Sequence, residues 1–182
     1  MDNYREIELS RQEKFKGKII SLDVETVKLP NGEVSFREIV RHNGAVSCLA
    51  VNEGRALFVT QWREPFKSVS IEIPAGKLDS ALEKPFEAIQ RELDEETGYQ
   101  ASNWKKVYDF YTSPGFSDEK MYFYYCDELS RLKDTRPLDD DEFLSVNWLT
   151  LSEAEKLIDS GRIVDLKTIM AINYWKTIEV AQ

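Results

Sequence analysis

The chain has 182 residues and a mass of 21.1 kDa, which suits one domain with or without a small attached region. Its 42% of hydrophobic residues excludes an intrinsically disordered chain, and its formal net charge of −9 excludes the basic footprint that non-specific nucleic-acid binding requires. The two cysteines and one histidine are too few for a disulfide scaffold or a cysteine-based zinc site. Without a hydrophobic run near the ~20 residues of a membrane span, and with a charged beginning, we expect a reduced, cytoplasmic protein that has no signal peptide, membrane partner or nucleic-acid partner.

Runs of β-branched and apolar residues predict β-strands from Phe15 onward. Pro30-Asn31-Gly32 and Asn52-Glu53-Gly54 supply two of the expected turns. The expected strands span residues 19–29, 34–41, 45–51, 56–61, 71–73, 104–111, 121–126 and 143–149. We expect residues 1–42 to form a small β-rich region and residues 43–182 to form the main domain.

Three helices are predicted, over residues 85–97, 153–159 and 166–180. The first should begin at Pro85, because proline suits the first helical position, and end at Gly98, which accepts a left-handed backbone. Ser152 and Glu155 have the spacing of a capping box at the second helix. The residues of the third helix at core spacing are Leu166, Ile169, Met170, Tyr174 and Ile178.

The first helix places several glutamates at the border of the core. Its apolar stripe consists of Phe86, Ile89 and Leu93. Glu92 and Glu96 fall beside that stripe, one turn apart, and Glu95 is within reach of Glu92. At ~5 Å and an effective dielectric constant of ~20, each close pair repels by roughly 3 kcal/mol. Such crowding calls for a bound proton, an arginine or a metal ion.

Two interpretations of this helix compete. Arg91 lies one turn from Glu95 and from Glu87, so the helix could be a solvated acidic face with an ion pair. A tight Ala75-Gly76 bend precedes it, and the core stripe adjoins the carboxylates, which favours a metal site. Oxygen ligands and the lack of a histidine–cysteine cluster favour Mg²⁺, with Mn²⁺ as a possible substitute, over zinc.

The segment from Gly76 to Tyr99 resembles the Nudix box, G-x(5)-E-x(7)-R-E-U-x-E-E-x-G-U, in which U is a bulky apolar residue. The run from Arg91 to Tyr99 matches the second half of the box, and Glu83 matches the upstream glutamate. Six residues, rather than five, separate Gly76 from Glu83, which leaves open whether Glu83 is a ligand or a local hydrogen-bonding residue.

The resemblance extends from Phe15 to about Trp175 and is closest to the ADP-ribose pyrophosphatase branch of the family. Gln61-Trp62-Arg63, the run from Glu72 to Gly76, and Pro114, sixteen residues beyond Gly98, carry this part of it. The resemblance implies an α/β fold, an α/β/α sandwich with a mixed sheet. It also implies Mg²⁺-dependent hydrolysis of ADP-ribose to AMP and ribose 5-phosphate. A homodimer is implied as well, in which N-terminal strands complete the partner's nucleotide pocket.

The resemblance further implies roles for individual residues. The implied metal ligands are Glu92, Glu96, Glu95, the carbonyl of Ala75, and Glu142. The implied catalytic group consists of Glu95, Arg91, Asp140 and Glu142, in which Arg91 orients the glutamates and Asp140 orients the attacking water. The implied substrate-binding residues are Arg37, Glu38, Arg63, Glu72 and Phe116.

Alternatives to this function remain open at the level of the sequence. One is the same reaction on a UDP- or GDP-linked sugar, another is a nucleotide-binding module that does not cleave its ligand, and a third is a structural domain with an acidic helix. Trp62 and Phe116 suit either the core or stacking on a base. We expect His42 at a strand end on the surface, and we expect Trp104, Trp148 and Trp175 to be packing residues.

Overall fold

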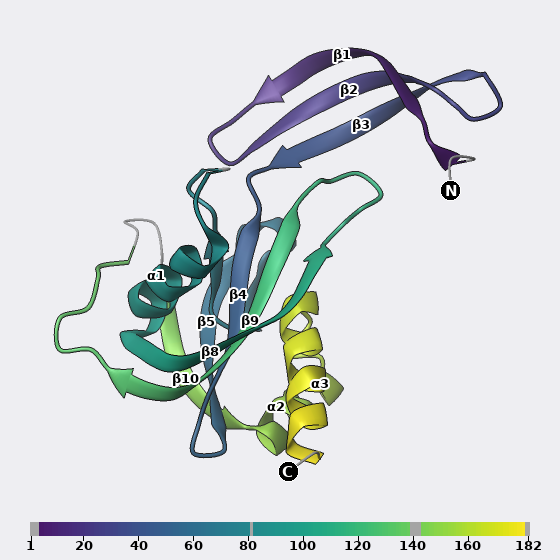
Figure 1. Cartoon of the computed structure of the whole chain (residues 1–182). Coiled ribbons are helices and arrows are strands. Elements are labelled where there is room, and N and C mark those ends of the chain that lie inside the picture. The colour runs from purple at the N-terminus through teal and green to yellow at the C-terminus, as the bar shows by residue number, and fades with distance from the viewer. Residues whose placement is uncertain (1–3, 81, 139–142, 181–182) are drawn as a thin grey trace.

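The computed structural model describes residues 4–80, 82–138 and 143–180, which form two β-sheets and three α-helices (Figure 1). The smaller sheet is antiparallel, has the order β1-β2-β3 and extends away from one end of the body. Its strands are β1 (Ile7–Lys16), β2 (Ile20–Lys28) and β3 (Val34–His42). The expectation that β-structure begins at Phe15 was wrong. The charged β1, all of whose residues are exposed, has little hydrophobic pattern of its own and owes its conformation to pairing with β2.

The larger sheet has the order β10-β5-β4-β9-β8, with β6 paired to β5 and β7 paired to β4. Its strands are β4 (Ala45–Asn52), β5 (Arg55–Arg63), β6 (Ser68–Glu72), β7 (Ala75–Lys77), β8 (Tyr99–Tyr111), β9 (Lys120–Arg131) and β10 (Leu144–Thr150). A 3₁₀ turn, η2 (Glu64–Phe66), joins β5 to β6. Because β4 and β9 run parallel while their neighbours run antiparallel, the sheet is mixed, as expected.

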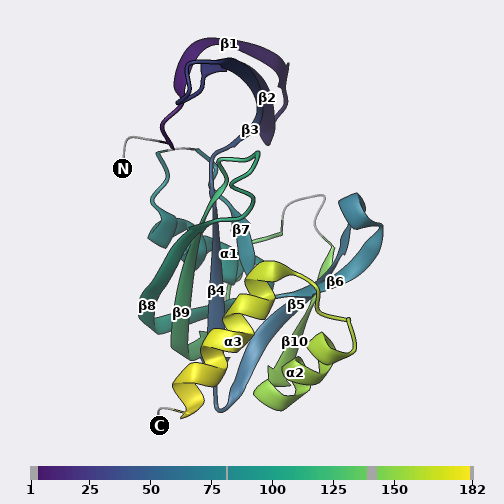
Figure 2. The same cartoon turned by 90° about the vertical axis from the view of Figure 1, so that its right-hand side faces the viewer.

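Helices cover both faces of this sheet (Figure 2). The helix α1 (Pro85–Thr97) packs on one face, where Val46 and Cys48 of β4 meet Ile89 and Leu93. The helices α2 (Leu151–Asp159) and α3 (Leu166–Val180) pack on the other face, against the group that includes Leu49. Alternate side chains of β4 therefore belong to the two hydrophobic cores, one on each face of the sheet. This arrangement confirms the predicted α/β/α sandwich.

The three predicted helices are confirmed, but two details differ. The capping box of α2 uses Thr150 and Glu153, not Ser152 and Glu155, because β10 runs directly into the helix and makes Thr150 the N-cap. In α3 the predicted Ile169, Met170, Tyr174 and Ile178 do pack against the core, but the fully buried positions are Thr168, Ala171, Ile172 and Trp175. Leu166, expected in the core, is 62% exposed.

The structure also tests the expectations for the tryptophans and for His42. Trp175 is buried, and Trp104 and Trp148 pack against the α1 core, so their packing role is confirmed. Trp62 is 54% exposed and belongs to neither core. His42 does end a strand, but its imidazole is mostly buried and accepts a hydrogen bond from the Gly44 amide (3.0 Å), so the expectation of a surface side chain was wrong.

The smaller sheet is tied to the loop between β8 and β9. The Val40 amide donates to the Phe116 carbonyl (2.8 Å), and the His42 amide donates to Asp118 (2.9 Å). Arg41 also contacts Asp118 (3.2 Å), and on β2 it reaches the mostly buried Asp23 (3.1 Å). This loop therefore connects the N-terminal sheet to the face of the body that carries the clefts described next.

Candidate active site

The sequence of α1 fixes where its carboxylates lie. Pro85 occupies the first turn, and Gly98, at φ 71°, ends the helix with its amide on the Asp94 carbonyl (2.7 Å). Between these ends, Ile89 anchors the helix in the core. Glu92 and Glu96 are held at the edge of that core, at 8% and 5% exposure.

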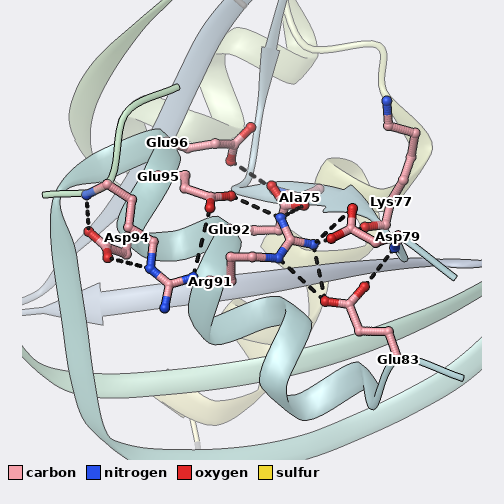
Figure 3. A network of polar contacts seen from close by, with 10 residues as sticks. Ala75, Lys77, Asp79, Glu83, Arg91, Glu92, Asp94, Glu95 and Glu96 are labelled. Carbon is pink, nitrogen blue, oxygen red and sulfur yellow. Dashed lines mark hydrogen bonds and ion pairs between the residues drawn. The ribbon is translucent and has the colours of Figure 1, made fainter. Parts of the chain in front are cut away.

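Arg91 gathers the glutamates of α1 (Figure 3). Its Nη1 donates to Glu92 and to Glu95, at 2.9 Å each, and its Nη2 lies 3.3 Å from Glu83. Burial alone would lower the pKa of this guanidinium, but the adjacent Glu92 and Glu95 raise it above its ordinary value. Of the two glutamates one turn from Arg91, Glu95 is its partner, whereas Glu87 pairs with Lys84 (2.7 Å). Arginine therefore compensates more of the crowding than the sequence indicated.

The bend before α1 packs closely on two of these carboxylates. The Ala75 amide donates to Glu96 Oε2 (3.0 Å), so the backbone of β7 is hydrogen-bonded to the helix. A Cβ built on Gly76 would lie 1.9–2.3 Å from the Glu92 carboxylate atoms. Only glycine leaves room for the Glu92 carboxylate here, which explains on steric grounds why position 76 is a glycine.

The donor set at the α1 edge fits a hard divalent cation. Glu92, Glu95 and Glu96 offer carboxylate oxygens on one helix, and Gly76 leaves the space that Glu92 occupies. Within residues 4–80, 82–138 and 143–180, however, no three acidic, histidine or cysteine side chains already converge as a metal-binding group. Arg91 and the Ala75 amide hold the carboxylates instead. Asp140 and Glu142 lie outside the described residues.

Two adjoining clefts open beside this edge. The first, of about 290 Å³, is lined by Ala75, Gly76 and Glu96 of the α1 region. The second, of about 420 Å³, is lined by Phe66, Phe110 and Thr112, among others. Arg63, Glu119, Met121 and Lys167 line both clefts. The shared wall therefore contributes two cations, Arg63 and Lys167, to the cleft that the buried Glu96 of α1 also lines.

Glu72 lines the second cleft and is more buried than Glu96 of the first, at 2% exposure against 5%. Arg63 donates to both of its oxygens, through Nε and Nη2 at 2.7 Å each, and Lys167 also contacts it. Burial would raise the pKa of this carboxyl, but hydrogen bonds and charge from Arg63 and Lys167 outweigh it and lower the pKa from 4.5 to about 2. Glu72 thus fixes the orientation of Arg63 rather than facing the cleft alone.

The remaining predicted substrate residues lie elsewhere. Arg37, Glu38 and Phe116 line a third cleft, of about 490 Å³, between the N-terminal sheet and the β8–β9 loop. Arg37 pairs there with Glu6. The third cleft shares no lining residue with the first two, so one chain does not bring all five predicted substrate residues together.

Comparison with known proteins agrees with this geometry. The NUDIX domain model matches residues 41–170, which include α1, β7 and the cleft wall. The chain belongs to the NUDIX family. A relative from Bacillus subtilis, named ADP-ribose pyrophosphatase, is 46% identical over 183 residues, covering 100% of this chain and 98% of that protein. A relative from Bacillus methanolicus, named methanol dehydrogenase activator, is 42% identical over 94% of this chain and 92% of that protein.

A solved structure shares the NUDIX fold of this chain. The crystal structure of an ADP compounds hydrolase superposes with a TM-score of 0.88 and covers 100% of this chain and 98% of that chain. The sequence identity is 17%, so this likeness concerns the fold. Among residues 4–80, 82–138 and 143–180, no helix is long and apolar enough to cross a membrane.

The sequence analysis of this NUDIX protein missed some residues of the cleft wall. Lys167, Glu119 and Asp165 were not singled out, although all three line a cleft. Lys167 meets Glu72 across 95 positions of sequence, and nothing in local periodicity indicates such a contact. The upstream glutamate of the box, Glu83, accepts hydrogen bonds from Asp79 (2.6 Å) and Arg91, which is a local bonding role.

Substituting Gly76→Ala tests the contact of β7 with Glu92. The new methyl group overlaps only the end of a flexible side chain, so we expect the melting temperature to change little. The displaced Glu92 carboxylate should lower hydrolytic turnover by about 100-fold, as loss of a positioned charged group does. Thermal unfolding and a turnover assay on the same preparation check both parts, and wild-type turnover in the folded variant would contradict the prediction.

Substituting Glu72→Gln tests the buried ion group. Because the pKa of Glu72 is lowered, its charged form stabilises the fold above about pH 4.5, and this stabilisation is lost as the pH falls toward 2. We expect the unfolding free energy of the variant to be about 3 kcal/mol lower than that of the unmodified protein at pH 7. At pH 3.5 this difference should be about 1.4 kcal/mol smaller. Urea unfolding at both pH values measures this.

The control for that experiment is Glu155→Gln. Glu155 pairs with Lys176 on the exposed surface (2.6 Å), so its removal should change the unfolding free energy by less than about 0.5 kcal/mol. An equal gap for Glu72→Gln at pH 7 and pH 3.5 would show that the Glu72 charge does not stabilise the fold.

Proposed function

We propose that this NUDIX protein hydrolyses the pyrophosphate bond of ADP-ribose, giving AMP and ribose 5-phosphate, with Mg²⁺ as its cofactor. The observation that supports it most is the first cleft, where the buried Glu96 stands beside the cations Arg63 and Lys167. A diphosphate is stabilised by nearby cations, and this cleft is lined both by side-chain cations and by Glu96, a carboxylate that could hold a metal ion. The Bacillus subtilis relative, at 46% identity, is named for this reaction.

In this proposal the residues at the edge of α1 would hold and orient the metal ion. Glu92, Glu96 and the Ala75 carbonyl would hold Mg²⁺, with Glu95 close by; bound there, the ion offsets phosphate charge and lowers the pKa of a coordinated water. Arg91 keeps the glutamates in orientation, as its contacts with Glu92 and Glu95 indicate.

Other residues would bind the substrate and prepare the attacking water. Arg63 would bind a phosphate oxygen, because its guanidinium is fixed by Glu72 and lines the cleft. Asp140 would orient the attacking water, and Glu142 would join the metal site; both lie outside the described residues.

The proposal includes a homodimer in the cytoplasm. The third cleft, with Arg37, Glu38 and Phe116, is separate from the α1 cleft within one chain. A second copy could bring the two together. The N-terminal sheet supports this, since it exposes large apolar side chains at Phe15 (55%) and Phe36 (66%).

The decisive experiment is a substrate panel read out as phosphate released after phosphatase treatment. We expect kcat/KM for ADP-ribose to exceed that for GDP-mannose, a UDP-sugar, NADH and a diadenosine polyphosphate by about tenfold or more. A higher kcat/KM for another sugar nucleotide would contradict ADP-ribose as the substrate but would leave the proposed reaction, hydrolysis of a pyrophosphate bond, in place. Binding without release of any product would favour a non-catalytic nucleotide-binding module.

Thermal unfolding with and without millimolar Mg²⁺ tests the metal site separately. Binding to the folded state should raise the melting temperature, and the rise should vanish in the double variant Glu92→Gln plus Glu96→Gln. The matched control is Glu87→Gln, which removes an exposed glutamate of the same helix and should keep the full rise. A melting temperature indifferent to Mg²⁺ in the unmodified protein would contradict the proposed site.

A further inference from the structure

Lys167 occupies a position between the two adjoining clefts. It is the second residue of α3, its side chain is 11% exposed, and it lines both clefts. Its ammonium group contacts Glu72 and lies 3.1 Å from Asp165. Its counterion Glu72 is almost fully buried, so the side chain of Lys167 is held at one place in the wall.

The contact of Lys167 continues through Glu72 to Arg63. Glu72 Oε2 accepts from both Lys167 and the Arg63 Nη2, and Glu72 Oε1 accepts from the Arg63 Nε. The bidentate pair uses one edge of the guanidinium. The other terminal nitrogen, Nη1, donates no hydrogen bond to any of the described residues, while Arg63 lines the cleft. That edge is therefore available to an anion in the cleft.

The rest of α3's first turn keeps Lys167 in place. Asp165 accepts from the Thr168 amide (3.0 Å) and from the Thr168 hydroxyl (2.6 Å), so it caps the helix while pairing with Lys167. The Thr168 hydroxyl in turn accepts from the Ile73 amide (2.9 Å), directly after Glu72. The helix end is thus hydrogen-bonded to the segment whose carboxylate it contacts.

We propose that Lys167 is a positioning residue that acts through Glu72 to hold Arg63 in the orientation that binds a phosphate of the substrate. The proposal rests on the proposed function, because it deepens the role of the same cleft. The Glu72 carboxylate pairs with both Lys167 and Arg63. It therefore holds Arg63 in place without fully neutralising the charge of the guanidinium. A phosphate contact made equally in the ground state and in the transition state affects KM more than kcat.

The test compares Lys167→Met with the control Lys176→Met, which removes an exposed lysine of the same helix that pairs with Glu155. We expect Lys167→Met to raise KM about tenfold with kcat changed less than about threefold, and Lys176→Met to leave both unchanged. Lys167→Gln, which keeps a hydrogen-bond donor without the charge, covers the case in which the methionine variant does not fold.

The dissociation constant for ADP, measured by titration calorimetry without turnover, should rise by the same factor as KM. This measurement does not depend on hydrolysis, so a failed substrate assignment and a failed role for Lys167 give different results. Unchanged ADP binding in a folded Lys167→Met or Lys167→Gln protein would overturn the proposal.

A double-mutant cycle separates positioning from direct contact. If Lys167 acts through Glu72, Lys167→Met should raise the ADP dissociation constant no further in a Glu72→Gln background. If the two effects multiply in full, Lys167 contacts the anion directly and the positioning role is wrong. Lys167→Arg, which retains the charge, should restore most of the affinity.

Discussion

The site depends on how the five residues from Glu72 to Gly76 are held between two helices. On one side, α3 contacts this segment through Lys167 on Glu72 and the Thr168 hydroxyl on the Ile73 amide. On the other side, α1 contacts it through Glu96 on the Ala75 amide and through Glu92, packed against Gly76. Because α1 and α3 cover opposite faces of the sheet, and β6 and β7 pair with the neighbouring strands β5 and β4, the segment between β6 and β7 is contacted by a helix from each face. Each of these contacts occupies a main-chain polar group or a buried charge, which explains why so short a segment is so tightly fixed.

The electrostatic crowding on α1 is real, but it does not by itself require a metal ion. Arg91 donates to Glu92 and Glu95, and the Ala75 amide donates to Glu96, so the carboxylates have partners before any cation arrives. The argument for a divalent ion is instead chemical. In the proposed function, a protein of net charge −9 would bring an anionic diphosphate next to the buried Glu96, in a cleft that is also lined by side-chain cations. A hard cation reverses the local field where the glutamates stand.

The sequence predicted local features well and distant ones poorly. The bounds of α1 followed from Pro85 and Gly98, and helical geometry alone placed Glu92 and Glu96 at the core edge. The pairing of Glu72 with Lys167 could not be predicted, since it joins two elements through the tertiary fold. Likewise β1 has no hydrophobic pattern because all its residues are exposed, and the contact of the Thr168 hydroxyl with the Ile73 amide could not be predicted from the apolar pattern of α3. Patterns report which face is apolar, whereas these contacts depend on which polar atoms meet.

Arg91 also affects how a cation could bind to the glutamates of α1. Arg91 retains its proton over the whole accessible pH range, so a cation that binds Glu92 must share this carboxylate with a permanent positive charge. Such sharing lowers the affinity of the glutamates for a free ion relative to an unshared set. Under the proposed function, a cation that arrives with a diphosphate would escape part of this cost, because Arg63 of the same cleft would stabilise the phosphate charge at the same time. The proposed sites would therefore favour joint binding of metal and diphosphate over binding of either alone, as linkage between two sites requires.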